Sequence, residues 1–126
     1  MHDLTVEQVL AIHAGIMVRD GGDNRVLSEA NLHQVIFQAN LLADPPARAA
    51  TAIYMLCAYP AFREGNKRTA QTVAERVLAE GGFSLPGNDP RCFALMQGVM
   101  DFTVEIDEIE QYIRNNTGTG SRSDRF

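Results

Sequence analysis

The chain has 126 residues, enough for one domain with a single hydrophobic core. Its net charge is −5 and it has no long basic block, so we do not expect it to bind nucleic acid directly. No apolar run approaches the ~20 residues of a membrane-spanning helix and no signal peptide is evident, so we expect a cytoplasmic protein with no membrane partner. The two cysteines, Cys57 and Cys92, lack metal-ligand spacing, and Cys57 lies in an apolar run that predicts a buried free thiol.

Capping residues indicate where most of the helices begin. An N-capping side chain precedes an apolar, helically periodic stretch at four places, and proline follows it at two of them. The predicted starts are Thr5, which forms a capping box with Gln8, then Ser28, Asp44 before Pro45, about Asn66, Asp89 before Pro90, and a last stretch that contains Ile106 and Ile113. Predicted helix ends are Gly21 with Gly22, Pro60, and Gly81 with Gly82.

These signals predict an all-α fold, a single compact bundle of about six helices with little or no β structure, over residues 1–115. The third helix, ending at about residue 58, is apolar on nearly all sides, so its neighbours should bury it. Residues 83–85 are expected to form only a short extended piece. Residues 116–126 are polar and rich in glycine, serine and threonine, and they are predicted to be a disordered tail.

The most informative segment is residues 62–70, which read Phe-Arg-Glu-Gly-Asn-Lys-Arg-Thr-Ala. It lies where a loop is predicted to run into a helix, and the free N–H groups and dipole of a helix start attract anions. Gly65 allows close approach of the backbone, and Lys67 and Arg68 add cationic donors. Glu64 is suited to hold a divalent cation that shares the phosphate oxygens. Cations in a first turn oppose the helix dipole, which favours a bound anion here.

This segment resembles the signature of the Fic/Doc family, roughly H-x-F-x-[DE]-[AG]-N-[GK]-R, and Lys67 makes it similar to the Doc (death on curing) toxin branch. Fic-type members of the family transfer AMP from ATP to a hydroxyl of a target protein. The Doc toxin instead transfers a phosphate, and its target is a translation elongation factor. The resemblance therefore implies the all-α Fic/Doc fold, with ATP and Mg²⁺ bound at this loop.

The resemblance also implies roles for individual residues. Phe62 would anchor the loop in the core, and Glu64 would be the metal-binding acid. Glu64 and Asn66 are expected to be catalytic, while Gly65, Asn66 and Lys67 line the anion hole. Arg68 is expected to reach a distal phosphate.

One position departs from the family pattern. The catalytic histidine is expected two residues before Phe62, where this chain has Pro60, a residue with no titratable group. The neighbouring Tyr59 is a poor base at neutral pH, because a phenol has a pKa near ~10. His13, on the first helix, is the only histidine of a predicted core helix that could approach the site, but the favoured interpretation is a histidine packed on an apolar stripe. We therefore expect impaired transfer.

The resemblance implies a protein partner, and two other functions remain to be weighed against the Doc-like one. The resemblance implies a Phd-like antitoxin whose helix lies in a groove near the active site, beside a target in the translation machinery. The main alternative is a non-catalytic Fic/Doc-fold protein that binds a nucleotide, another anion or an antitoxin helix. A helical binding module, such as a transcription regulator with an accidental motif, is disfavoured by the acidic charge and by the nine-residue match.

Overall fold

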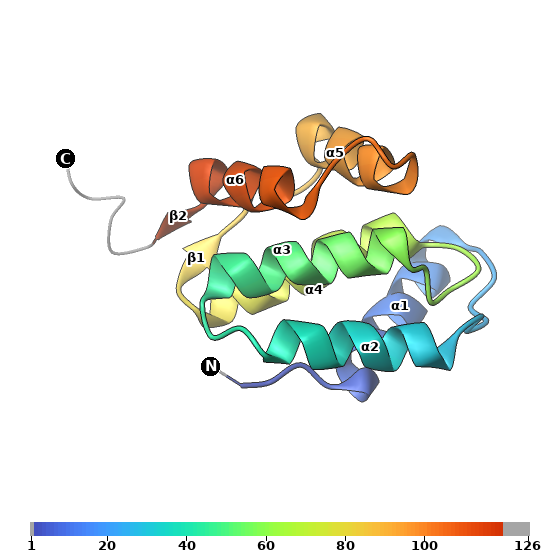
Figure 1. Cartoon of the computed structure of the whole chain (residues 1–126). Coiled ribbons are helices and arrows are strands. Elements are labelled where there is room, and N and C mark those ends of the chain that lie inside the picture. The colour runs from blue at the N-terminus through green and yellow to red at the C-terminus, as the bar shows by residue number, and fades with distance from the viewer. Residues whose placement is uncertain (1, 120–126) are drawn as a thin grey trace.

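Six helices and two very short strands make up residues 2–119, the part of the chain that the computed structural model describes (Figure 1). In chain order the elements are α1 (Val6–Asp20), α2 (Glu29–Asn40), α3 (Pro45–Ala58), α4 (Asn66–Glu80), β1 (Phe83–Ser84), α5 (Pro90–Met100), α6 (Ile106–Asn116) and β2 (Gly118–Thr119). The predicted all-α class is confirmed. In this part of the chain, no helix combines the length and the apolar character needed to cross a membrane.

Side chains cap four helices at the residues that the sequence predicts. Thr5 forms the capping box of α1, and Ser28 accepts a first-turn N–H of α2. Asp44 and Asp89 do the same for α3 and α5, each followed by proline at the first helical position. The start of α4 differs from these four, because its N-cap is Gly65, which has no capping side chain.

The central helix is α3, which contacts α2, α4, α5 and α6 (Figure 1). Its Ala49, Ala50 and Ala52 are completely buried, so the surrounding helices approach its backbone closely. This confirms the prediction that the third helix is buried on nearly all sides. The first helix, α1, packs against α4 and α2. Its residues His13 and Met17 lie next to Gly65, at the end of the loop between α3 and α4.

The C-terminal boundary differs from the prediction of a tail beginning at residue 116. Asn116 still belongs to α6, where its side chain donates a hydrogen bond to the Tyr112 carbonyl at 2.8 Å. Gly118 then pairs with Ser84 in an antiparallel β1–β2 ribbon. This pairing depends on an edge at residues 83–84, far away in sequence, so the local composition could not reveal it. The rest of the predicted tail, residues 120–126, lies outside the described residues.

Both cysteines are free and buried, as predicted for Cys57. Burial raises the pKa of the Cys57 thiol to about 12 and that of the Cys92 thiol to about 11. Neither thiol is therefore ionised near neutral pH, and both behave as small core residues.

Candidate phosphate-binding site

A cavity of about 380 Å³ lies at the junction between the α3–α4 loop and the first turn of α4. Residues 63–68 form one part of its lining, and Phe93 and Met100 of α5 complete it. The structure thus brings five predicted site residues, residues 64–68, to one cavity. Phe62 is instead buried in the core at 1% exposure, and Pro60 lies on the surface away from the lining.

The backbone conformation at Gly65 favours glycine. It is left-handed, with φ of +82° and ψ of +14°, a conformation that disfavours residues with a side chain. A Cβ atom here would also lie 2.5 Å from the Cε atom of Met17, the flexible end of that side chain, which would have to move, and at van der Waals distance, 3.5 Å, from the ring of His13. The glycine therefore allows the loop to lie directly on α1.

The first turn of α4 leaves its backbone donors open. No side chain caps it, and the first hydrogen bond of the helix runs from Thr69 N to Gly65 O at 2.9 Å. The N–H groups of residues 66–68 therefore have no acceptor within residues 2–119, and they lie at the positive end of the helix dipole. A left-handed residue followed by a right-handed one also forms a backbone nest, a concavity that binds anions.

The Asn66 side chain closes the loop instead of facing a ligand. Its Oδ1 accepts the Phe62 N–H at 3.1 Å, and its Nδ2 donates to the Phe62 carbonyl at 2.8 Å. Both polar atoms of the amide are therefore engaged with the loop backbone. Asn66 borders the cavity as predicted for a site residue, but its side chain is held against the loop, and its backbone N–H is the donor at the open helix start.

Residues 26–28, just before α2, form hydrogen bonds and a β-bridge with the start of the loop between α3 and α4. Val26 forms an isolated antiparallel bridge with Phe62. The Ala61 carbonyl accepts the N–H groups of Leu27 and Ser28, at 2.7 and 3.1 Å. These contacts fix the course of the backbone just before the open turn.

The two motif cations have partners on different helices. Lys67 Nζ donates to the neutral Gln97 side chain of α5 at 2.8 Å, and Arg68 pairs with Asp20 at the end of α1 at 2.5 Å. Asp20 also binds Arg19, and the hydrogen bonds from Arg19 first and Arg68 second hold the pKa of the Asp20 carboxyl well below its usual range. One carboxylate thus serves two guanidinium groups, so positive charge remains at the cavity.

Glu64 is exposed, and its Oε2 atom accepts the backbone N–H of Asp23 at 3.2 Å. Within residues 2–119, no group of three or more histidine, cysteine, aspartate or glutamate residues is arranged to hold a metal ion. Glu64 therefore fits Mg²⁺ only as a single protein ligand, with phosphate oxygens and water completing the coordination, which is a common mode for this ion.

Neither Pro60 nor Tyr59 offers a general base at the loop cavity. The Pro60 carbonyl accepts a hydrogen bond from Asn31 Nδ2 at 3.1 Å, and the proline has no group that could move a proton. Tyr59 is exposed and borders a different small hollow, beside Phe102 and Val104. Among the described residues that line the loop cavity, none is a histidine.

His13 contacts the loop, an arrangement that the sequence left open but did not favour. It is buried on α1, as expected for a histidine on an apolar stripe, and its ring stacks on Phe62. Its Nε2 atom also lies 2.7 Å from the Glu64 carbonyl oxygen. Helical periodicity indicated burial of His13, but no local signal connected it with a loop 51 positions later.

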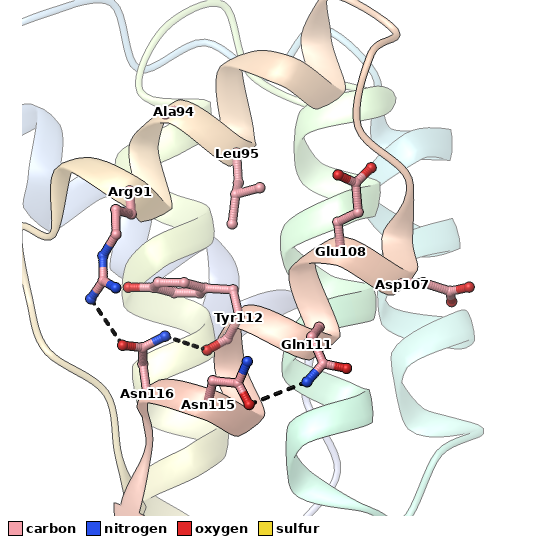
Figure 2. A pocket seen from close by; sticks show the side chains of 9 residues that line it. All are labelled: Arg91, Ala94, Leu95, Asp107, Glu108, Gln111, Tyr112, Asn115 and Asn116. Atoms are coloured by element: carbon pink, nitrogen blue, oxygen red, sulfur yellow. Dashed lines mark hydrogen bonds between the residues drawn. The ribbon is translucent and has the colours of Figure 1, made fainter.

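A second hollow, of about 680 Å³, lies between α5 and α6 (Figure 2). Its charged and polar groups are largely satisfied: Arg91 pairs with Asp89 at 3.0 Å, donates to Asn116 at 2.9 Å and lies over the Tyr112 ring. Burial and a hydrogen bond to Asp89 raise the pKa of the Tyr112 phenol well above its usual range. This groove is larger than the loop cavity but offers no open helix start.

The middle of the α5–α6 groove is apolar. Figure 2 shows Leu95 pointing into the space between the two helices, with Asp107 and Glu108 at the end away from Arg91. The groove therefore has an apolar middle and acidic residues at one end, which suits a protein segment better than a phosphate.

Comparison of the chain with models of protein families finds no match, and comparison with curated proteins finds no significant match.

Proposed function

We propose that this chain is a Doc-like protein of a toxin–antitoxin module, which binds the phosphate chain of ATP at residues 63–68 and transfers phosphate or AMP to a target protein. The acceptor would be a hydroxyl of a component of the cytoplasmic translation machinery, such as an elongation factor. The observation that carries the proposal is the uncapped start of α4 at Gly65, which faces a cavity with an excess of positive charge.

The charge around the cavity supports an anionic ligand. Three cationic side chains and one anionic side chain line it, although the whole chain has a net charge of −5. The volume of about 380 Å³ falls in the range of small-molecule sites, roughly 300–1,000 Å³. Open N–H groups and cations at one helix start favour a phosphate over an uncharged ligand.

Each motif residue has a role that fits phosphoryl transfer, which depends mainly on positioning and charge stabilisation. The N–H groups of residues 66–68 bind phosphate oxygens, and Lys67 and Arg68 neutralise charge. Phe62 and Asn66 hold the loop in shape. Glu64 would hold Mg²⁺, whose contribution when bound is to neutralise charge on the phosphate oxygens.

Transfer is expected to be slow, because no base stands at the expected position. General-base catalysis typically contributes ~10²–10⁴-fold, and Pro60 cannot provide it. This observation favours one alternative, a non-catalytic relative that retains the nucleotide site. The two proposals share the same ligand and differ only in chemistry, so one experiment separates them.

An antitoxin helix is the proposed protein partner, and the α5–α6 groove is its proposed place. The apolar side chains of Ala94 and Leu95 would receive the apolar face of such a helix, and Asp107 and Glu108 would pair with basic residues on it. The loop cavity is lined by other residues of the same helix, Phe93 and Met100, so α5 connects the groove with the phosphate site.

The test is calorimetric titration of the protein with ATP and Mg²⁺, followed by transfer assays with α- and γ-labelled ATP and purified translation factors. Label on a protein from γ-labelled ATP alone identifies a kinase, whereas label from α-labelled ATP identifies an AMP transferase. Binding without transfer establishes the non-catalytic alternative. Absence of ATP binding contradicts both.

The variant Pro60→His tests the role of the missing base. If only the base is lacking, the histidine should raise the transfer rate by about 10²-fold, the lower end of what a general base contributes, and leave ATP affinity unchanged. Pro60→Ala is the matched control, because it removes the proline without adding a titratable group. Equal rates in the two variants would show that the side chain at position 60 does not limit transfer.

A further inference from the structure

His13 joins the hydrophobic core to the phosphate loop by one hydrogen bond. Its ring is buried, with 2% exposure, and is stacked on Phe62, with centroids 3.7 Å apart and planes 7° from parallel. Its Nε2 atom lies 2.7 Å from the carbonyl oxygen of Glu64. Because a carbonyl oxygen only accepts, Nε2 must carry the proton and donate it.

The direction of this hydrogen bond determines where the next N–H points. A peptide unit is planar and trans, so its C=O and N–H bonds point in opposite directions. His13 holds the Glu64 carbonyl toward α1, and the Gly65 N–H of the same peptide is therefore directed away from α1. Glu64 and Gly65 both line the cavity. A Cβ atom at Gly65 would point toward α1, because it would lie 2.5 Å from Met17 and 3.5 Å from the His13 ring.

We infer that His13 is a positioning residue for phosphate binding: its hydrogen bond orients the Glu64–Gly65 peptide so that the Gly65 N–H joins the open N–H groups of α4 around one phosphate. This inference rests on the proposed function, since it concerns the same loop. His13 would thus control the geometry of the anion site without contacting the ligand.

The stack on Phe62 makes the orientation specific. A ring fixed against a second buried ring has little rotational freedom, so the Nε2–H direction is fixed as well. Gly65 lies directly beside the ring, since a Cβ atom there would be in van der Waals contact with it at 3.5 Å. The His13 ring, Gly65 and the Glu64 carbonyl group are therefore packed together next to the cavity that Glu64 and Gly65 line.

Two substitutions separate the hydrogen bond from the packing. His13→Phe keeps an aromatic ring for the stack on Phe62 and removes the donor. His13→Gln provides an amide N–H at a similar distance along the side chain and loses the ring. His33→Phe is the control, because His33 is an exposed histidine on α2.

The readouts are affinity for inorganic phosphate and for ATP with Mg²⁺ by calorimetry, and the Gly65 amide signal in nitrogen–proton NMR spectra during the phosphate titration. His13→Phe should weaken binding by about tenfold, as expected for one hydrogen bond to a charged group. His13→Gln should stay within about threefold of the unsubstituted protein, and His33→Phe should not change it. Thermal denaturation verifies that each variant is folded.

The outcomes distinguish this inference from the proposed function. If the unsubstituted protein binds neither phosphate nor ATP, both fail. If it binds them and folded His13→Phe binds equally well, the inference alone is overturned. If His13→Phe does not fold, the test is the phosphate titration of the unsubstituted protein followed by NMR. A Gly65 amide signal that shifts on phosphate binding supports the inference. A Gly65 signal that stays unchanged while phosphate binds overturns it.

Discussion

The first turns of α4 and α5 both carry an arginine that is paired with an aspartate, but the backbone N–H groups of the two turns are satisfied in opposite ways. At α5, Asp89 accepts the backbone N–H of Arg91 and pairs with its guanidinium group at 3.0 Å. At α4, Gly65 provides no capping side chain, and the N–H groups of the turn find no acceptor in residues 2–119. The start of α5 is complete without a ligand, whereas the start of α4 requires an anion or water to complete it.

The comparison shows why the larger hollow is not the stronger candidate for a phosphate site. The α5–α6 groove has a volume of about 680 Å³, against about 380 Å³ for the loop cavity, but the groove borders the helix start that is already capped. Unsatisfied donors and unbalanced charge identify an anion site more reliably than volume does. A phosphate loses its bound water when it enters a site, and only hydrogen-bond donors and positive charge, not space, compensate for that free-energy cost.

The largest expected effect is that of Gly65→Ala, compared with Gly82→Ala. The two glycines have nearly the same φ, +82° and +85°, but a Cβ at Gly65 would meet Met17 whereas nothing lies within 4 Å at Gly82. Both variants should lose about 1–2 kcal/mol of stability from the left-handed conformation. Only Gly65→Ala should also lose ATP affinity, by about a hundredfold, because each lost hydrogen bond to a phosphate is worth about 1.5–3 kcal/mol.

Calorimetric titration and thermal denaturation of the same samples measure both effects. Equal ATP affinity in the two glycine variants would contradict the assignment of the phosphate site, since it would place the ligand away from the start of α4.

Arg68→Ala and Arg91→Ala test whether the starts of α4 and α5 differ in their contribution to ATP binding. Arg68→Ala should weaken ATP binding by about tenfold, the expected loss of one charge-assisted hydrogen bond. Arg91→Ala should leave ATP binding unchanged, because Arg91 lines the α5–α6 groove and not the loop cavity. A filter or calorimetric assay at fixed ionic strength distinguishes them, and similar losses in both would indicate a general charge effect.

Asn66→Ala should lower the free energy of unfolding by about 1–3 kcal/mol, because it leaves the buried N–H and C=O of Phe62 without their partner. Asn115→Ala is the matched control, since Asn115 is exposed and accepts only one bond, from Gln111. Urea denaturation measures both. A small effect at Asn66 would mean that the loop does not depend on this clamp.

The smallest expected effect concerns the completed start of α5. Hydrogen bonds from Arg91 first and Tyr112 second lower the pKa of the Asp89 carboxyl from 3.8 to about 2. Because the folded value lies below the unfolded one, Asp89 stabilises the fold above about pH 4, and this contribution is lost as the pH falls toward about 2. Asp89→Asn should therefore reduce the loss of stability between about pH 5 and about pH 3, as measured by urea denaturation.

The control for that measurement is Asp107→Asn, an exposed residue on α6. An Asp89→Asn variant that retains the full acid sensitivity of the unsubstituted protein would contradict the assignment.

The helix starts could be predicted from sequence because capping is local. Thr5, Ser28, Asp44 and Asp89 each act within three residues of their own position, so the amino-acid order alone contains the information. The ribbon between β1 and β2 was not predictable in this way, because Gly118 requires a partner 34 positions earlier, at Ser84.

The site was predictable only where it is continuous in sequence. Residues 64–68 were predicted together and line one cavity. Phe93 and Met100 complete that cavity from α5, and His13 orients the loop from α1, but none of the three carries a motif. Their contribution depends on how distant helices pack, which periodicity does not reveal.

The contacts between α1 and the loop have a consequence for the order of folding. His13 meets Glu64 across 51 positions, and Asp20 meets Arg68 across 48. Bringing such distant residues together is entropically unfavourable and slow compared with forming a single helix. The loop is therefore expected to acquire its shape only when α1 docks on α4, so a nascent chain would have no formed loop cavity until α4 has emerged from the ribosome. A fragment that begins after α1 would keep every residue that lines the cavity and still lack the cavity's geometry.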